Sequence, residues 1–249
     1  MAERRVVVVT GAAGGIGQAI VREFAQAGYD VIATDTAVQP GNLPCALYIE
    51  ADLACTVADE VYASDVFARI LAFLDGVPLT ALVNNAALQI LGGADRLTRD
   101  DWRRTLDVNL LAPFVWTQAL LPALERGPGG VVNISSIHAR LTKKDFVAYA
   151  TSKAALSGMT RALAVDLGGR VRVNAIEPAA VATGMLKAGF AGQPERYAAL
   201  ESCHPAGRVG RPDEVASLVR AVVETGALFF NGACIALDGG IGGVLHDPV

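Results

Sequence analysis

The stretch that decides the fold is VVVVTGAAGGIG, residues 6–17. Its four valines predict a short strand that is buried on both faces, as in a parallel sheet covered by helices. The glycine-rich turn then opens directly into a segment with helical periodicity, Ile16–Ala27. Glycine lets the backbone approach a pyrophosphate, and a helix N-terminus supplies free N–H groups and a positive dipole end. This order predicts a dinucleotide-binding turn, against the alternative of a glycine turn without a ligand. Its expected contacts come from Gly11, Ala13, Gly15, Ile16 and Gly17.

Apolar strand-like runs alternate with helix-length segments along the rest of the chain. The expected strands are Val6–Val9, Val31–Thr34, Ala46–Glu50, Ala81–Val83, Val131–Ile134, Val171–Ile176 and Cys234–Leu237. Further helices are expected at Val57–Leu74, Arg99–Leu124, Tyr149–Leu167 and Asp213–Glu224. This alternation predicts an α/β protein with a Rossmann-type, doubly wound parallel sheet and helices on both faces. Ligands of such sheets bind at the carboxyl ends of the strands, so the chemistry should follow the apolar runs.

Composition narrows the classes of protein. The 249 residues carry no repeat or linker and suit one domain, 1–249; 52% are hydrophobic, 18% are charged and the net charge is −4. Mixed charges indicate neither nucleic acid nor a membrane as a partner, and a small-molecule substrate is expected. The four cysteines lack metal-ligand spacing, so no metal site is expected. With no apolar span of membrane length, we expect a soluble, cytoplasmic protein with reduced thiols.

Asp35 ends the second predicted strand, eighteen positions after Gly17. A carboxylate there can accept hydrogen bonds from both adenosine ribose hydroxyls and would repel a 2′-phosphate. No Arg or Lys stands near it, so the sequence predicts NAD rather than NADP; the alternative is a turn or capping Asp. Asp52 and Leu53 follow the third strand and could reach the adenine edge, although any helix N-terminus also favours an Asp.

The segment from Val131 to Lys153 carries the strongest chemical signal. Ser136 follows an apolar strand, while Tyr149 and Lys153 are four apart in a helical run and so share one face. A nearby cation lowers the pKa of a phenol, which could then exchange a proton with a substrate hydroxyl or carbonyl. Ser136 could hydrogen-bond the same oxygen. A Tyr and a Lys at this spacing are common on solvated helices, so only the serine and the phosphate turn make the pair specific.

Together these motifs resemble the short-chain dehydrogenase/reductase family, in its short single-domain branch. The resemblance covers nearly the whole chain and includes TGAAGGIG, Asn84-Asn85-Ala86-Ala87, LDVNL and the thirteen-residue step from Ser136 to Tyr149. It also includes three later stretches: PAAVAT, which begins at Pro178, then GRVGRPDEVA and finally NGACIALDGG. It implies an NAD-dependent oxidoreductase that interconverts a secondary alcohol and a ketone. The implied substrates are a sugar or polyol, a hydroxy acid or a 3-oxoacyl compound.

The resemblance also implies roles for single residues. Tyr149 is the expected general acid/base, Lys153 binds the nicotinamide ribose and lowers the pKa of the tyrosine, and Ser136 orients the substrate oxygen. Asn109 would bend its helix and hold a water in a proton relay, unless it is only a buried Asn bonded to backbone. The implied cofactor contacts are Asn85, Ala86, Tyr149, Lys153, Pro178, Val181 and Thr183. Relatives of this kind are usually homotetramers.

The substrate side is less defined. The resemblance implies a mobile lid over residues 184–208, which includes Met185. His138, Arg140, Lys143 and Lys144 lie between Ser136 and Tyr149, where a basic cluster could attract an anionic substrate; a solvated loop is the simpler interpretation. The residues argue against two other functions. A non-catalytic NAD sensor would not need Ser136, Tyr149 and Lys153 together, and a serine hydrolase would need a strained GxSxG-type turn, which NISSIH is not.

Overall fold

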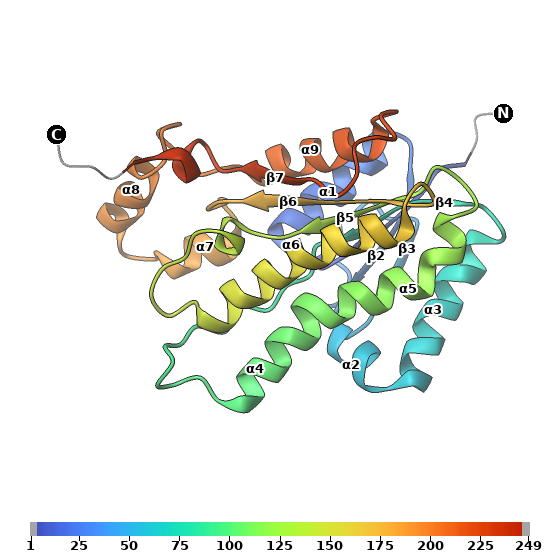
Figure 1. The fold of residues 1–249 in the computed structure, drawn as a ribbon, viewed down its shortest axis with the longest axis horizontal. Coiled ribbons are helices and arrows are strands. Elements are labelled where there is room, and N and C mark those ends of the chain that lie inside the picture. The colour runs from blue at the N-terminus through green and yellow to red at the C-terminus, as the bar shows by residue number, and fades with distance from the viewer. Residues whose placement is uncertain (1–3, 246–249) are drawn as a thin grey trace.

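The structure, a computed structural model, describes residues 4–245. Within this range seven strands form one parallel sheet of order β3-β2-β1-β4-β5-β6-β7, as predicted (Figure 1). The strands are β1 (Val6–Thr10), β2 (Asp30–Asp35), β3 (Leu47–Glu50), β4 (Leu79–Asn84), β5 (Gly130–Ile134), β6 (Arg172–Pro178) and β7 (Cys234–Leu237). The α-helices are α1 (Gly15–Gln26), α2 (Leu53–Ala58), α3 (Glu60–Leu74), α4 (Arg99–Leu106), α5 (Ala112–Leu124), α6 (Val147–Leu167), α7 (Gly184–Gly189), α8 (Pro194–Ser202) and α9 (Pro212–Glu224).

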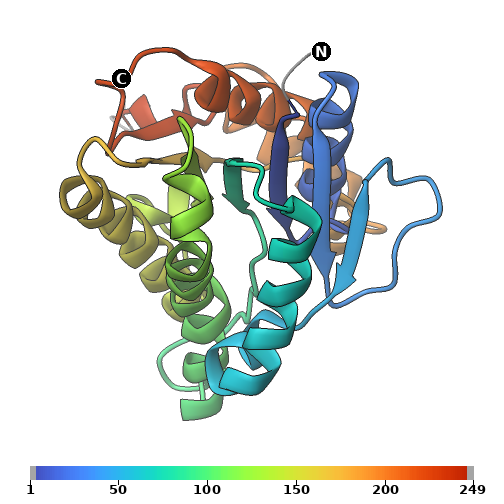
Figure 2. The same ribbon diagram turned by 90° about the vertical axis from the view of Figure 1, so that its right-hand side faces the viewer.

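The alternation of side chains along β1 explains why both faces of the sheet are covered. Val6 and Val8 point into a core formed with α3, α5 and α6, whereas Val7 and Val9 point into a second core formed with α1 and α9. Figures 1 and 2 show these helices on the two faces of the sheet. Each fully buried valine contributes about 1.5–3 kcal/mol relative to an exposed one. No described helix is long and apolar enough to cross a membrane.

One predicted helix is wrong. The periodicity predicts a single helix over Val57–Leu74, but α2 ends at Ala58 and α3 starts at Glu60. Asp59 separates them because its backbone is extended and its carboxylate accepts hydrogen bonds from the N–H groups of Val61 and Tyr62. An Asp in the N-cap position satisfies N–H groups that would otherwise have no partner, so a new helix begins there.

A second helix departs from its predicted form. The helix expected at Arg99–Leu124 is continuous, but it has a π-helical turn at Asp107–Leu111 between α4 and α5. Such a turn inserts one residue per hydrogen-bonded ring and is frequent at functional sites. It lies in the middle of the helix and includes Asn109.

Because all the strands are parallel, the loops that follow β1, β4, β5 and β6 meet at one edge of the sheet. These loops hold the glycine-rich turn, Asn85, Ser136 and Val181. The helix α6 packs against β5 and β6 and brings Tyr149 and Lys153 to the same edge. The fold therefore collects the predicted site residues from distant parts of the sequence.

Candidate active site

The glycine-rich turn has room for backbone and nothing else. Gly11 has φ +65°, and a Cβ there would lie 2.7 Å from the Cα of Ala86. A Cβ on Gly17 would lie 2.0 Å from the carbonyl oxygen of Gly11. The first turn of α1 has no side-chain cap and no acidic residue, so its N–H groups and positive dipole end are available to an anion. The turn therefore fits the pyrophosphate of a dinucleotide.

Asp35 is hydrogen-bonded to this glycine-rich turn. One oxygen of its carboxylate accepts a hydrogen bond from the N–H of Ala13 at 2.9 Å, and the other accepts one from the N–H of Ala37 at 3.1 Å. Burial and the nearby charges of Asp35 and Glu50 raise the pKa of Tyr48 to about 12. The surroundings of Asp35 are thus acidic, as its predicted role against a 2′-phosphate requires.

Asn85 and Ala86 are held against β1. The side-chain amide of Asn85 donates to the carbonyl oxygens of Thr10 and Gly11 at 2.9 and 3.0 Å. The hydroxyl of Thr10 accepts hydrogen bonds from the N–H groups of Asn85 and Ala86. The Asn85 side chain thus fixes the glycine-rich turn, and its contact with a cofactor stays a prediction.

The other predicted cofactor residues separate into two groups. Thr183 caps α7 and lies beside Gly15, where an added Cβ would be 3.0 Å from its side chain. Pro178 ends β6 and Val181 follows it, so both lie at the carboxyl edge of the sheet. By contrast, Asp52 caps α2 by accepting a hydrogen bond from the N–H of Ala54, and Leu53 is buried in the core. The alternative reading of Asp52 as a helix cap describes its geometry.

The three predicted catalytic side chains lie together. Ser136 follows β5 and is buried, and its hydroxyl accepts a hydrogen bond from the N–H of His138 at 3.2 Å. Lys153 is 1% exposed; its ammonium donates to the carbonyl oxygen of Ile134 at 2.8 Å and lies 5.8 Å from the ring centre of Tyr149. A serine, a phenol and a lysine therefore meet at the carboxyl edge beside the glycine-rich turn.

Burial controls the electrostatics of this site. It raises the pKa of the Tyr149 phenol, and a hydrogen bond with Ser136 opposes that rise. Burial also lowers the pKa of Lys153 to about 7. In the protein alone, the pKa of Tyr149 is therefore raised by burial and not lowered by Lys153 as the sequence predicts. A lysine with this pKa is only partly charged near neutral pH, and its full effect on the phenol stays a prediction for the complex with cofactor.

Asn109 sits in the π-helical turn with its side chain fully engaged. Its amide nitrogen donates to the carbonyl oxygen of Leu88 and to the hydroxyl of Ser152, both at 2.9 Å. Its amide oxygen accepts a hydrogen bond from the N–H of Leu88 at 2.7 Å. The helix is distorted at Asn109, as expected, and the side chain ties it to α6. The water relay stays a prediction.

On the substrate side, His138 forms part of an aromatic wall. Its ring stacks on Phe146 at 4.4 Å between centres and meets the ring of Tyr149 edge-on at 5.7 Å. Burial, together with the charge of Lys143, lowers the pKa of His138 to about 4, so its imidazole is neutral at pH 7. A neutral imidazole whose ring contacts that of Tyr149 can hydrogen-bond a substrate hydroxyl.

Two other candidates for substrate contact differ from His138. The guanidinium of Arg140 pairs with Glu177 at 2.7 Å, so a structural contact already uses it. Met185 belongs to α7, which lies with α8 in the segment predicted to be a lid, and its side chain is outside the described part of the structure. Substrate contacts of both residues stay predictions.

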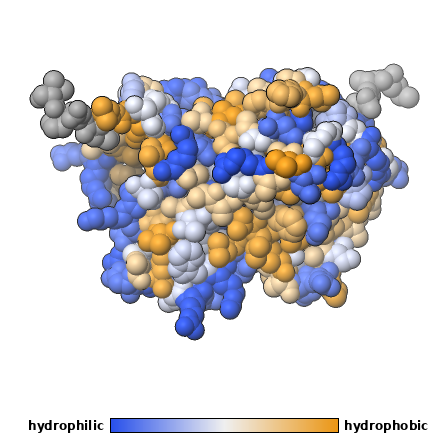
Figure 3. Space-filling view, viewed as in Figure 1, coloured by the Kyte–Doolittle hydropathy of each residue, from blue (hydrophilic) through white to orange (hydrophobic). Residues whose placement is uncertain are grey.

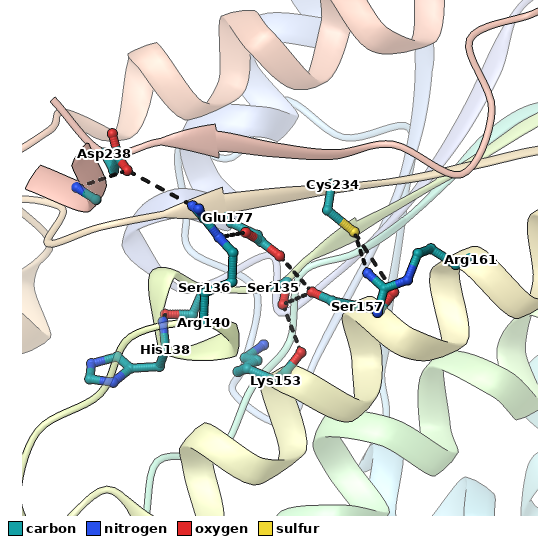
Figure 4. A network of polar contacts seen from close by, with 11 residues as sticks. Ser135, Ser136, His138, Arg140, Lys153, Ser157, Arg161, Glu177, Cys234 and Asp238 are labelled. Atoms are coloured by element: carbon teal, nitrogen blue, oxygen red, sulfur yellow. Dashed lines mark hydrogen bonds and ion pairs between the residues drawn. The ribbon is translucent and has the colours of Figure 1, made fainter. Parts of the chain in front are cut away.

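Four polar residues that sequence reasoning missed support this arrangement. They are buried or nearly so, and each contacts a predicted site residue or its neighbour: Thr10, Ser135, Ser157 and Glu177. Figure 4 shows the last three in one network of polar contacts beside Lys153 and Ser136. Thr10, Ser135 and Glu177 had one common signal in the sequence, a polar side chain at or next to the end of an apolar strand, whereas Ser157 lies inside α6 and had no such signal. No cluster of metal-ligating side chains occurs between residues 4 and 245.

Comparison with known proteins agrees with this geometry. A family model described as enoyl-(acyl carrier protein) reductase matches residues 11–242. The chain is 35% identical to D-threitol dehydrogenase of Mycolicibacterium smegmatis, over 95% of this chain and 92% of that protein. It is 36% identical to galactitol 2-dehydrogenase of Cereibacter sphaeroides, over 93% and 92%. The ligand-free aldohexose dehydrogenase of Thermoplasma acidophilum superposes with a TM-score of 0.91 at 30% identity, over 99% and 97%. The chain therefore belongs to the short-chain dehydrogenase/reductase family of oxidoreductases.

Proposed function

We propose that this protein is an NAD-dependent dehydrogenase that interconverts a polyol or sugar and the corresponding ketone. The observation that carries the proposal is the meeting of Ser136, Tyr149 and Lys153 beside a glycine-rich turn that fits a dinucleotide. The relatives named above act on threitol, galactitol and aldohexoses, which supports a polyhydroxylated substrate.

The side chains divide the chemistry between them. A nicotinamide cofactor, when bound, supplies or accepts the hydride. In the oxidation, the phenolate form of Tyr149 takes the proton of the substrate hydroxyl and becomes a phenol as the substrate carbon gives up its hydride; in the reduction, the phenol returns that proton to the substrate oxygen. Ser136, which lowers the pKa of the Tyr149 phenol, would hold the same oxygen. Lys153 would bind the nicotinamide ribose and supply positive charge beside the phenolate.

The choice of NAD rests on Asp35. Its carboxylate ends β2 beside the glycine-rich turn, and Glu50 adds a second negative charge on the neighbouring strand. Two carboxylates at this place disfavour a 2′-phosphate, whereas ribose hydroxyls can donate to them. A cation that could offset this charge does not follow β2 in the sequence.

A hydroxy acid is the second candidate substrate class. Lys143 supports it, because its ammonium lies 4.7 Å over the ring of Phe146 and so stands beside the wall formed with His138. A carboxylate bound there would pair with this cation. Lys143→Ala would then raise the KM of a hydroxy acid without changing that of a polyol.

A substrate panel tests the proposal. Purified protein is mixed with NAD or NADP and with D-threitol, galactitol, glycerol, aldohexoses and short hydroxy acids, and the absorbance of the reduced cofactor is followed. We expect turnover of at least one polyol or sugar, with NAD preferred. Intact NAD binding without turnover of any compound would instead support a non-catalytic sensor.

The predicted homotetramer remains part of the proposal. Figure 3 shows apolar side chains gathered on the face that carries α5, where Leu111 and Phe114 are partly exposed. Burial of such a surface between copies of the chain would be favourable. Light scattering of the purified protein gives the oligomeric state directly.

A further inference from the structure

Glu177 is a carboxylate in an unexpected place. It lies in β6, next to the last residue of that strand, and only 1% of its surface is exposed. A buried carboxylate is costly unless it is paired and hydrogen-bonded. Both of its oxygens are used: one accepts a hydrogen bond from the hydroxyl of Ser157 at 2.8 Å, and the other accepts one from the guanidinium of Arg140 at 2.7 Å.

The first oxygen connects Glu177 to the catalytic helix. Ser157 lies one helical turn after Lys153 in α6, and its hydroxyl is 2.9 Å from that of Ser135. The hydroxyl of Ser135 in turn contacts the backbone carbonyl oxygen of Lys153 at 3.0 Å. Ser135 also directly precedes Ser136, so this arm links the catalytic lysine and the catalytic serine (Figure 4).

The second oxygen connects Glu177 to the loop after Ser136. Arg140 is two residues beyond His138, whose ring faces Tyr149. The same guanidinium reaches Asp238, with 3.9 Å between nitrogen and oxygen. The carboxylate of Asp238 accepts hydrogen bonds from the N–H groups of Gly240 and Gly242, so this arm also fixes the loop after β7.

We propose that Glu177 is a positioning residue of the active site: through Ser157 it sets the place of Lys153 and Ser136, and through Arg140 it sets the loop that carries His138. This assigns Arg140 to the protein's own carboxylate instead of to an anionic substrate. The kinetic part of the proposal rests on the proposed function above. We call the contacts from Glu177 through Ser157 to Lys153 the helix arm, and the contact from Glu177 to Arg140 the loop arm. Because the two arms lead to different parts of the site, their loss should change different kinetic parameters.

The two arms can be cut separately. Glu177→Gln keeps an acceptor for Arg140 and a donor for Ser157, so it serves as the conservative parent and should retain kcat and KM within about threefold. Arg140→Met in that parent cuts the loop arm without leaving an unpaired buried charge. Ser157→Ala cuts the helix arm. Glu125→Gln removes the partner of Arg170 in a surface ion pair away from the site and is the control.

Kinetics with the best alcohol of the panel separate positioning from folding. Cutting the loop arm should raise KM about tenfold with kcat within about threefold, because the loop borders the substrate. Cutting the helix arm should lower kcat about tenfold with KM within about threefold. Rates are normalised to folded protein. Unchanged parameters in both variants, or a loss that follows only the folded fraction, would overturn the proposal.

Hydrogen exchange gives a readout that does not depend on turnover. The amides of Ala139, Arg140 and Leu141 bond to the carbonyl oxygens of Ser136 and Ile137. Cutting the loop arm should speed exchange in peptides covering 137–141, and cutting the helix arm should speed it in peptides covering 150–158. No local change in either variant would refute positioning. If no alcohol is turned over by the wild type, the proposed function fails while this comparison still decides the role of Glu177.

Discussion

The nucleotide side and the substrate side of the site are built differently. On the nucleotide side, the contacts of the glycine-rich turn are almost all with backbone or with short side chains, such as those of Thr10, Asn85 and Asp35. On the substrate side, long side chains meet: His138 stacks on Phe146, and Arg140 pairs with a buried carboxylate. The nucleotide side therefore tolerates little change in its backbone, whereas substitution of side chains on the substrate side can change which groups face the substrate.

The catalytic pair stands between the two sides, so its loss should have the largest effect. Tyr149→Phe removes only the hydroxyl that exchanges the proton. We expect turnover to fall about a thousandfold, because the phenol exchanges the proton of the substrate, while cofactor affinity changes by less than about threefold, because the other expected cofactor contacts remain. Steady-state rates and a titration of NADH fluorescence measure the two quantities. A variant with more than a tenth of the wild-type rate would show that another group carries the proton.

Gly17→Ala should disrupt the glycine-rich turn on the nucleotide side and leave the substrate side in place. The new methyl group would meet the carbonyl oxygen of Gly11 at 2.0 Å, so the turn must move. We expect a loss of about 3 kcal/mol in unfolding free energy and a cofactor affinity about a hundredfold weaker. Gly14→Ala is the matched control, since its Cβ would lie 3.4 Å from the same oxygen. Similar behaviour of the two variants in denaturant and binding titrations would argue against a tight cradle.

Lys153→Met should reveal the cost of burying the ammonium. Burial lowers the pKa of Lys153 from 10.5 to about 7, so the unfolded protein binds the proton more tightly. The wild type therefore loses stability as pH falls from about 10.5 to about 7, whereas the Lys153→Met variant has no such loss because its side chain binds no proton. We expect the stability of the variant relative to wild type to rise by roughly 2–3 kcal/mol between about pH 9 and about pH 6. Urea unfolding measures this, and a pH-independent difference would mean that the lysine is not desolvated.

Asp35→Asn should have the smallest effect and sharpen the account of the nucleotide side. The amide oxygen can still accept from the N–H of Ala13, but the negative charge is gone. We expect the ratio of kcat/KM for NADP to that for NAD to rise about tenfold, as expected for loss of one charge repulsion near a surface. Asp30→Asn, at the other end of β2, is the control. An unchanged ratio would remove Asp35 from cofactor choice.

The same contrast explains what could be predicted from the sequence. The sheet and the positions of Ser136, Tyr149 and Lys153 follow from local patterns: apolar runs, a glycine turn and a four-residue spacing. The break at Asp59 had a signal as well, because an Asp before Glu-Val-Tyr is a helix cap, but the apolar periodicity on either side hid it.

Glu177 could not be placed from the sequence. Its partners Ser157 and Arg140 come from a distant helix and a distant loop, and only the packed fold shows that a carboxylate next to the end of a buried strand is paired. The same holds for the electrostatics of the catalytic pair. Spacing predicted that Lys153 would lower the pKa of Tyr149, but the depth of burial of both groups depends on tertiary packing.

The measurement that tests the central claim most directly is transfer of a labelled hydrogen. The protein is incubated with NAD and with a polyol deuterated at its secondary carbinol carbons, and the reduced cofactor is analysed by mass spectrometry. We predict that the wild type transfers one deuterium to the cofactor and forms a ketone, and that Tyr149→Phe does neither at a comparable rate. Bound NAD that acquires no deuterium from any alcohol of the panel would contradict the account.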